Sequence, residues 1–283
     1  MATIEYMPAR LTPQEIGDLR QAVACLEGAS FAQRLTDAVG RPIGLLGRTL
    51  PQPARQVIAQ VSETALRRAL RLALRTLDLN APAKSANRAH KLALAASGAV
   101  GGALGLAALP VELPISTTIL LRSIAEIARE EGEDLSAPEA ALACVEVFAL
   151  GGQAAGESAF ESGYFAVRAA LAKAVSDSAR FGAAEGVAAL PAPVVARLIS
   201  QVAARFGIVV SEKLAAQAAP VLGAIGGAAV NAAFADHFQT LARGHFIVRR
   251  LERRHGASLI AFEYQRLRGE RARERTDSRR AAS

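Results

Sequence analysis

Apolar residues along this chain recur at the three- and four-residue spacing of helices, and no segment beyond short pieces such as 208–210 alternates apolar and polar residues as a strand would. The clearest helix is 54–79, where one face collects Val57, Val61, Leu66, Leu70, Leu74 and Leu77. The same spacing predicts further helices over 13–39, 114–131, 137–150, 164–181, 193–214, 220–255 and 259–267. The pattern therefore predicts an all-α fold organised as a single multi-helix domain.

Prolines, glycines and polar capping residues mark the ends of several of these helices. The segments 12–15 (Thr-Pro-Gln-Glu) and 136–139 (Ser-Ala-Pro-Glu) both have the spacing of a capping box at a helix start. Pro110 and Pro114 argue against one uninterrupted helix across them, because each lacks a backbone donor, so a new helix is predicted to begin near Pro114. An interruption is also predicted near Gly207.

The longest uncharged stretch, 92–111, carries glycines four residues apart, at Gly98 and Gly102 and again at Gly101 and Gly105. On a helix this spacing leaves one face with little more than backbone, so another helix can approach closely. Three interpretations follow: the stretch spans a bilayer, which takes about 20 apolar residues, lies at the bilayer surface, or packs against another helix in water. Alanine and glycine contribute little to membrane insertion, which weakens the first interpretation.

A second glycine-rich run resembles the first. Segment 98–109 matches segment 223–234 at seven of twelve positions, and the repeated pattern includes Gly223, Gly226 and Gly227. Both segments are rich in alanine, so chance accounts for some matches, and an internal pseudo-duplication is one explanation of the rest. We predict that the two glycine-rich helices contact each other and that the domain is organised around them.

The predicted helix 54–79 also carries a basic stripe, formed by Arg67, Arg71 and Arg75 at a spacing of four. Such a helix can lie on an anionic bilayer, burying its leucines while the arginines meet the lipid head groups. The alternative is a bundle helix whose arginines are simply solvated.

Composition and charge predict the cellular location of the protein and indicate a second basic segment. Cys25 and Cys144 stand alone and the N-terminal residues lack the features of a secretory signal, so we expect a cytoplasmic, peripherally membrane-associated protein. Twelve of the 33 Lys and Arg residues but only five of the 26 Asp and Glu residues lie from Arg243 onward, so the net charge of +7 belongs to the C-terminal end.

The segment 268–283 has almost no apolar content and is predicted to be disordered. It suits an anionic lipid or another polyanion better than a specific nucleic acid, because aromatic residues that could stack on bases are few nearby. A merely solubilising tail is the alternative.

Carboxylates in apolar surroundings are the best candidates for a ligand-binding site. Glu112 lies between two prolines, Glu146 lies in an apolar run, and Glu126 follows Arg122 by one helical turn. Such a group has a raised pKa or a cationic partner and can mark a functional site. A structural ion pair, with Arg122 or Lys213 for example, is the alternative. We expect Glu112 to have a functional role.

Asn231 and His237, both on the predicted helix 220–255, complete the ligand-binding candidates. A single Glu-x-x-His occurs, at Glu252 and His255, whereas a di-iron bundle needs two such pairs and further glutamates. We therefore predict no metal site and no cofactor. No protease, hydrolase or nucleotide-binding signature is present, so no catalytic residues are predicted.

Two blocks of the sequence resemble the EcsC family of bacterial proteins. The first starts at His90 with HKLALAASGAVGGALGLAALPVELP and continues through the capped helix that follows. The second starts at Lys213 with KLAAQAAPVLGAIGGAAVNAAF. The similarity spans roughly 82–256 and implies an all-α fold and a membrane-linked setting, because the family takes its name from a locus beside an ABC transporter. It implies no catalytic residues.

The chain is accordingly divided into N-terminal helices with a basic amphipathic helix (1–80), an EcsC-like helical core (81–256), and a short helix with an Arg-rich tail (257–283). We expect a membrane-associated helical protein that binds a lipid or apolar ligand, or a transporter-linked membrane partner, between its glycine-rich helices. Two alternatives stand: an enzyme of unknown type that uses buried glutamates, and a soluble protein-interaction module.

Overall fold

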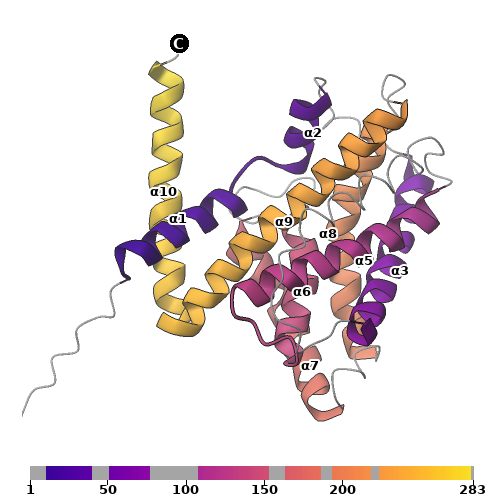
Figure 1. Cartoon of the computed structure of the whole chain (residues 1–283), viewed down its shortest axis with the longest axis horizontal. Coiled ribbons are helices and arrows are strands. Elements are labelled where there is room, and N and C mark those ends of the chain that lie inside the picture. The colour runs from indigo at the N-terminus through magenta and orange to yellow at the C-terminus, as the bar shows by residue number, and fades with distance from the viewer. Residues whose placement is uncertain are drawn as a thin grey trace, which may run out of the picture.

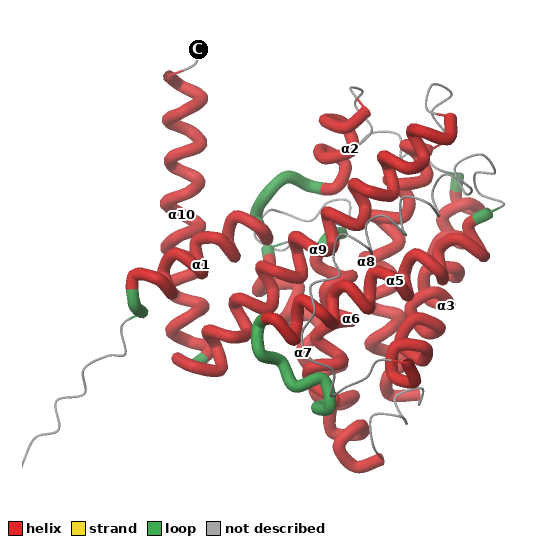
Figure 2. Tube along the Cα trace, viewed as in Figure 1, coloured by secondary structure: helices red, strands yellow, loops and turns green. Residues whose placement is uncertain are grey.

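The computed structural model describes residues 11–39, 51–76, 108–152, 163–185, 193–217 and 223–281, and within these ranges it contains nine helices and no strand (Figures 1 and 2). The helices are α1 (Pro13–Leu26), α2 (Phe31–Val39), α3 (Gln52–Thr76), α5 (Leu109–Glu130), α6 (Pro138–Leu150), α7 (Tyr164–Glu185), α8 (Pro193–Gln217), α9 (Gly223–His255) and α10 (Ala257–Ala281). The predicted all-α domain is confirmed.

Helix α9, the longest of the described helices, runs across the molecule, and most of the other described helices pack against it (Figure 1). It packs against α1, α2, α5, α6, α8 and α10, whereas α3 packs on α5 and α8 at the other side. The centre of the core is a cluster of aromatic rings from α6, α8 and α9, in which neighbouring centroids of Phe148, Phe206 and Phe238 are 5.0–5.6 Å apart. A second core cluster joins α1, the end of α9 and α10 through residues such as Leu19, Val248 and Tyr264.

The first predicted helix is divided in two, which corrects the prediction of one helix over 13–39. The capping box at its start is confirmed: the Thr12 hydroxyl accepts from the Glu15 amide, and the Glu15 carboxylate accepts from the Thr12 amide. The helix ends at Leu26, and a new one begins after Ser30, whose hydroxyl accepts from the amide of Gln33. The Ser30 cap therefore starts a second helix at a point where the apolar spacing alone predicts no break.

Helix α5 passes through both prolines, so the predicted start near Pro114 is wrong. Pro110 lies in the first turn, where a missing amide costs nothing, and Pro114 removes only one hydrogen bond near the helix start. The Thr118 hydroxyl donates to the carbonyl of Pro114. Helix α8 likewise continues through Gly207 without the predicted interruption, because α3 packs over it there, with Ser62 and Ile58 facing the glycine.

Two helix ends also differ from prediction. The N-cap of α6 is Ala137, because the Ser136 hydroxyl donates to Asp134 instead of capping the helix. Helix α10 continues to Ala281, where a disordered tail after a short helix was predicted; its far half extends away from the other helices (Figure 1). Arg266 pairs with Glu263 and Glu270 along this helix, and such neighbouring pairs favour helix in a polar segment.

The predicted crossing of the two glycine-rich helices lies largely outside the described residues, which exclude Gly98, Gly101, Gly102 and Gly105. Of the second run, Gly223, Gly226 and Gly227 lie in the first turns of α9. The close approaches that the structure does show are at other glycines. A Cβ on Gly244 would lie 2.7 Å from Leu26 of α1, and one on Gly152 would lie 2.2 Å from the carbonyl oxygen of Arg205 in α8.

No helix in the described ranges combines the length and the apolar character needed to cross a bilayer.

Candidate functional sites

Three places in the fold bring chemically active side chains together: a buried ion pair between α5 and α8, a groove between α3 and α5, and a pocket bounded by α6, α7, α9 and α10.

The first is built around Glu112, in the first turn of α5. Its Oε1 atom accepts hydrogen bonds from Lys213 Nζ at 2.7 Å, Ser116 Oγ at 2.5 Å and Asn231 Nδ2 at 3.3 Å. The Lys213 ammonium also lies 4.7 Å from the centroid of the Phe234 ring, which suits a cation. Three helices thus contribute to one buried cluster, and the structural alternative stated for this carboxylate, a pair with Lys213, is present.

Burial alone would raise the pKa of the Glu112 carboxyl, but the Lys213 ammonium and the hydrogen bonds outweigh burial and hold the pKa below its ordinary value. Burial also lowers the pKa of Lys213, against the opposite effect of Glu112. Both groups are almost completely buried, so each charge depends on the other for its stability.

The second place is a groove of about 450 Å³ between α3 and α5, lined by Arg68, Leu72, Pro110, Val111, Pro114, Ile115, Thr118 and Ile119. Three large apolar side chains remain exposed around it: Val111 (68%), Ile115 (50%) and Leu72 (47%). Of the predicted basic stripe, Arg71 is exposed, and Arg67 is half-buried and pairs with Glu63 at 2.6 Å. The side chain of Arg75 lies outside the described part.

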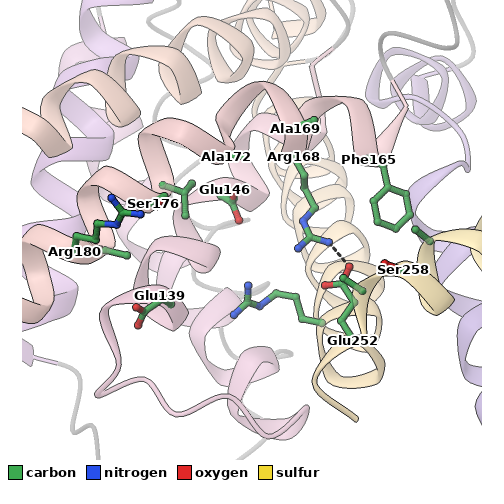
Figure 3. A pocket seen from close by; sticks show the side chains of 15 residues that line it. Glu139, Glu146, Phe165, Arg168, Ala169, Ala172, Ser176, Arg180, Glu252 and Ser258 are labelled. Carbon is green, nitrogen blue, oxygen red and sulfur yellow. Dashed lines mark hydrogen bonds and ion pairs between the residues drawn. The ribbon is translucent and has the colours of Figure 1, made fainter. Parts of the chain in front are cut away.

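The third place is a pocket of about 830 Å³ (Figure 3). Its walls are alanines and Val175 along α7, two alanines at the start of α10, and the Phe165 ring. Its charged lining residues are Glu139, Glu146, Arg168, Arg180, Arg249 and Glu252. Arg168 and Glu252 lie at one end in Figure 3, Arg180 and Glu139 at the other, and Glu146 between them.

Glu146 is the buried carboxyl of this pocket. Its side chain is 6% exposed, and no described residue donates a hydrogen bond to it; Nε2 of His245 lies 4.0 Å from Oε2, beyond bonding distance. Burial raises the pKa of Glu146, with the positive charges of Arg168 and Arg249 opposing that effect.

Both of these arginines are held by other carboxylates. Arg168 donates to Glu252 at 2.8 Å, and Arg249 forms two hydrogen bonds to Glu133, at 2.7 and 3.2 Å, while Arg253 also binds Glu133. The result is a pocket whose inner arginines already bind carboxylates, whereas its inner carboxyl binds no described arginine.

The structure brings together only some of the residues nominated from sequence. Glu112 and Asn231 share one cluster, Glu146 lies in the pocket, and Glu126 is half-buried on α5. His237 is buried against Phe31 and Gly151, and neither ring nitrogen is hydrogen-bonded to a residue in the described ranges. Burial lowers the pKa of His237 to about 3.

Sequence reasoning missed Ser116 in the first cluster, and Tyr164, Arg168, His245 and Arg249 around Glu146. The only available signal was negative: an isolated carboxylate in an apolar helix requires a partner, but the partner comes from another helix. The Glu-x-x-His spacing has a different purpose from metal binding, since Glu252 binds Arg168 and His255 binds Glu15 at 2.8 Å. Within the described ranges, no three His, Cys, Asp or Glu side chains converge as metal ligands would.

The chain matches the model of the EcsC protein family over residues 18–251, and it therefore belongs to the EcsC family. The match begins well before the resemblance at 82–256 noted in the sequence, and it takes in most of α1 and all of α2 and α3. No curated protein and no solved structure matches the chain.

Proposed function

We propose that this EcsC family protein attaches peripherally to anionic membranes through the surface formed by α3 and α5, and that the groove on this surface accommodates part of a lipid. One observation carries the proposal: three of the five large apolar side chains exposed in the described part of the chain, Leu72, Val111 and Ile115, surround the groove. Exposed apolar residues gathered in one place mark an interaction surface, whereas scattered ones do not.

The charge beside the groove favours an anionic bilayer over an apolar protein surface. Arg68 lines the groove, and Arg71 lies one turn beyond Arg67 on the same helix. Arg68 and Arg71 are both exposed. Arginines at such a surface each contribute about 1 kcal/mol of attraction to anionic lipid. Since Arg67 is already paired with Glu63, the proposal assigns the larger share to Arg68 and Arg71.

The expected affinity is low and the attachment reversible. Fully burying a Val, Leu or Ile side chain stabilises by about 1.5–3 kcal/mol, so the exposed parts of three of them contribute on the order of 3 kcal/mol. Two arginines add roughly 2 kcal/mol. Such a total corresponds to millimolar or somewhat tighter binding, which suits a peripheral protein. Two free cysteines within the described residues are compatible with the cytoplasmic face that we propose as its location.

Vesicle flotation tests the proposal. The protein is expected to float with vesicles that contain phosphatidylglycerol at low salt, and to remain at the bottom with pure phosphatidylcholine vesicles. Val111→Asp with Ile115→Asp should abolish flotation. The matched control is Phe262→Asp, which changes an equally exposed residue on α10 and should leave flotation unchanged.

Absence of flotation with anionic vesicles at low salt would reject membrane attachment and leave the protein-interaction module as the better explanation of the exposed groove. Equal flotation of the groove variant and the control would reject this surface as the attachment site.

A further inference from the structure

We infer that the pocket bounded by α6, α7, α9 and α10 binds a small organic cation, an ammonium group on an apolar body, with the Glu146 carboxylate as its anchor. The inference goes beyond membrane attachment and does not rest on it, because the pocket and the α3–α5 groove share no lining residue.

The first step is the unsatisfied carboxyl. Glu146 is 94% buried as a side chain, faces the pocket, and receives no hydrogen bond from any described residue. Leaving a buried carboxylate without a donor is costly, and a donor carried by a ligand in the pocket would satisfy it. Figure 3 shows the Glu146 carboxyl group among the side chains that line the pocket.

The second step concerns the charged groups beside Glu146. Glu252 binds Arg168 at one wall, and Glu133 binds both Arg249 and Arg253 behind another. Of the two carboxylates at the inner end of the pocket, Glu252 is hydrogen-bonded to an arginine, whereas Glu146 is not hydrogen-bonded to any described residue. Beside Glu146, an anionic ligand would meet arginines that already bind carboxylates, so a cation is the favoured ligand at this end, and a charge-assisted hydrogen bond is the stronger kind.

The third step concerns His245, which lies behind Glu146. Arg168 donates to the Tyr164 oxygen at 3.2 Å, and that hydroxyl lies 3.0 Å from His245 Nδ1. If the hydroxyl donates its proton to Nδ1, the proton of the neutral imidazole is on Nε2, the nitrogen that faces Glu146. Burial holds the pKa of His245 well below its ordinary value, so the ring stays neutral and cannot replace a cationic ligand.

The last step is the shape of the ligand. Ala169, Ala172, Val175 and Ala179 give one side of the pocket an apolar wall along α7, and the first turns of α10 also line it. This wall fits an alkyl or other apolar body attached to the ammonium group. Each buried methylene should tighten binding by about three- to fourfold.

The test is a ligand-observed NMR titration of the full-length protein, without vesicles, using three probes of equal length: hexylammonium, hexanol and hexanoate. Hexylammonium should bind about tenfold more tightly than hexanol, and hexanoate should bind least. Glu146→Gln should weaken hexylammonium binding by about tenfold or more. Glu139→Gln, at the exposed end of the pocket, is the matched control and should change it by less than about twofold.

Equal affinity for hexylammonium and hexanol would overturn the inference, and so would unchanged binding by Glu146→Gln or a complete lack of hexylammonium binding. Should Glu146→Gln fail to fold, Ala172→Leu gives the decision, because it narrows the pocket at an exposed wall position without touching a charge. Ala172→Leu should bind hexylammonium more weakly than the unmodified protein, whereas the Glu139→Gln control should not. If Ala172→Leu binds hexylammonium as tightly as the unmodified protein, the pocket is rejected as the binding site.

Competition by phosphatidylethanolamine vesicles would identify the natural amine as a lipid head group, and lack of competition would identify it as a soluble amine.

Discussion

Lys213 Nζ lies 2.7 Å from Glu112 Oε1, although 101 residues separate the two in the sequence. The pair is buried, and Ser116 and Asn231 complete the hydrogen bonding of the carboxylate. A buried ion pair is costly to break even where it contributes little net stability, because the remaining charge has no solvent. This relationship governs what substitutions at either residue should do.

Lys213→Met should lower the free energy of unfolding by about 3–5 kcal/mol, because it leaves the Glu112 carboxylate buried without a counter-charge. The double variant Lys213→Met with Glu112→Gln should be clearly more stable than Lys213→Met alone, since Gln keeps an acceptor for Ser116 and Asn231. Urea denaturation measures both. Additive losses in the double-mutant cycle would show that the two charges do not depend on each other.

Glu112→Gln alone distinguishes the functional role expected from sequence from a structural one. Given the pair with Lys213, we now expect a lowered thermal melting temperature, because the ammonium loses its partner. A melt equal to that of the unmodified protein, with a loss of cellular activity, would restore the functional interpretation.

Glu15 should make folding stability sensitive to acid. Hydrogen bonds from His255, from the Thr12 amide and from Arg254 lower the pKa of Glu15 to about 2, from 4.5 in the absence of such contacts. A carboxyl whose pKa is lower in the folded than in the unfolded protein stabilises the folded state at pH values above the unfolded pKa. This stability is lost as the pH falls from 4.5 toward 2. Denaturation of the unmodified protein and Glu15→Gln should therefore differ at neutral pH and converge in acid. A difference that does not depend on pH would contradict the assignment.

Gly244 should tolerate no side chain. Gly244→Ala places a methyl group 2.7 Å from Leu26 and 2.9 Å from Cys25, where α1 crosses α9, and should destabilise by about 1–3 kcal/mol. Gly17→Ala is the matched control within α1, because nothing lies within 4 Å of the added group, and it should stabilise by about 1 kcal/mol through helix propensity. Thermal melts of the two variants should shift in opposite directions.

The arginines of α3 should contribute unequally to lipid binding. Arg71→Gln should weaken flotation with anionic vesicles more than Arg67→Gln does, because Arg67 is neutralised by Glu63. Salt should weaken the binding of the unmodified protein and reduce the difference between the variants. The reverse order of the two variants would show that the pair with Glu63 does not persist at the membrane.

Hexylammonium binding should be lost in acid through the protonation of Glu146. Because burial raises the pKa of this carboxyl, the loss should begin above the ordinary range of a glutamate. The groups that face Glu146 are Arg168 on α7 and His245, Arg249 and Glu252 on α9. The residual binding of hexylammonium by Glu146→Gln should not show this loss in acid. If the variant still loses binding over the same pH range, another group is responsible for the loss.

The sequence was sufficient for the fold class and for most helices, because these depend on interactions within a few residues. The Thr12–Glu15 capping box follows from neighbouring side chains, and the starts of α7 and α8 follow from the apolar spacing; the structure agrees with all three. The prediction failed at Pro114, which lies close enough to the start of α5 to remove only one hydrogen bond. It also failed at Gly207, where α3 packs over α8 and outweighs the local preference.

For the sites, apolar surroundings were enough to nominate Glu112 and Glu146, since a carboxylate in an apolar helix requires a partner wherever the helix packs. Only the tertiary structure decided that Lys213 holds the first and that the second faces a pocket between two arginines already bound to other carboxylates. Those partners lie on different helices, and their distances depend on how the whole chain packs around α9. No periodicity within one helix contains that information.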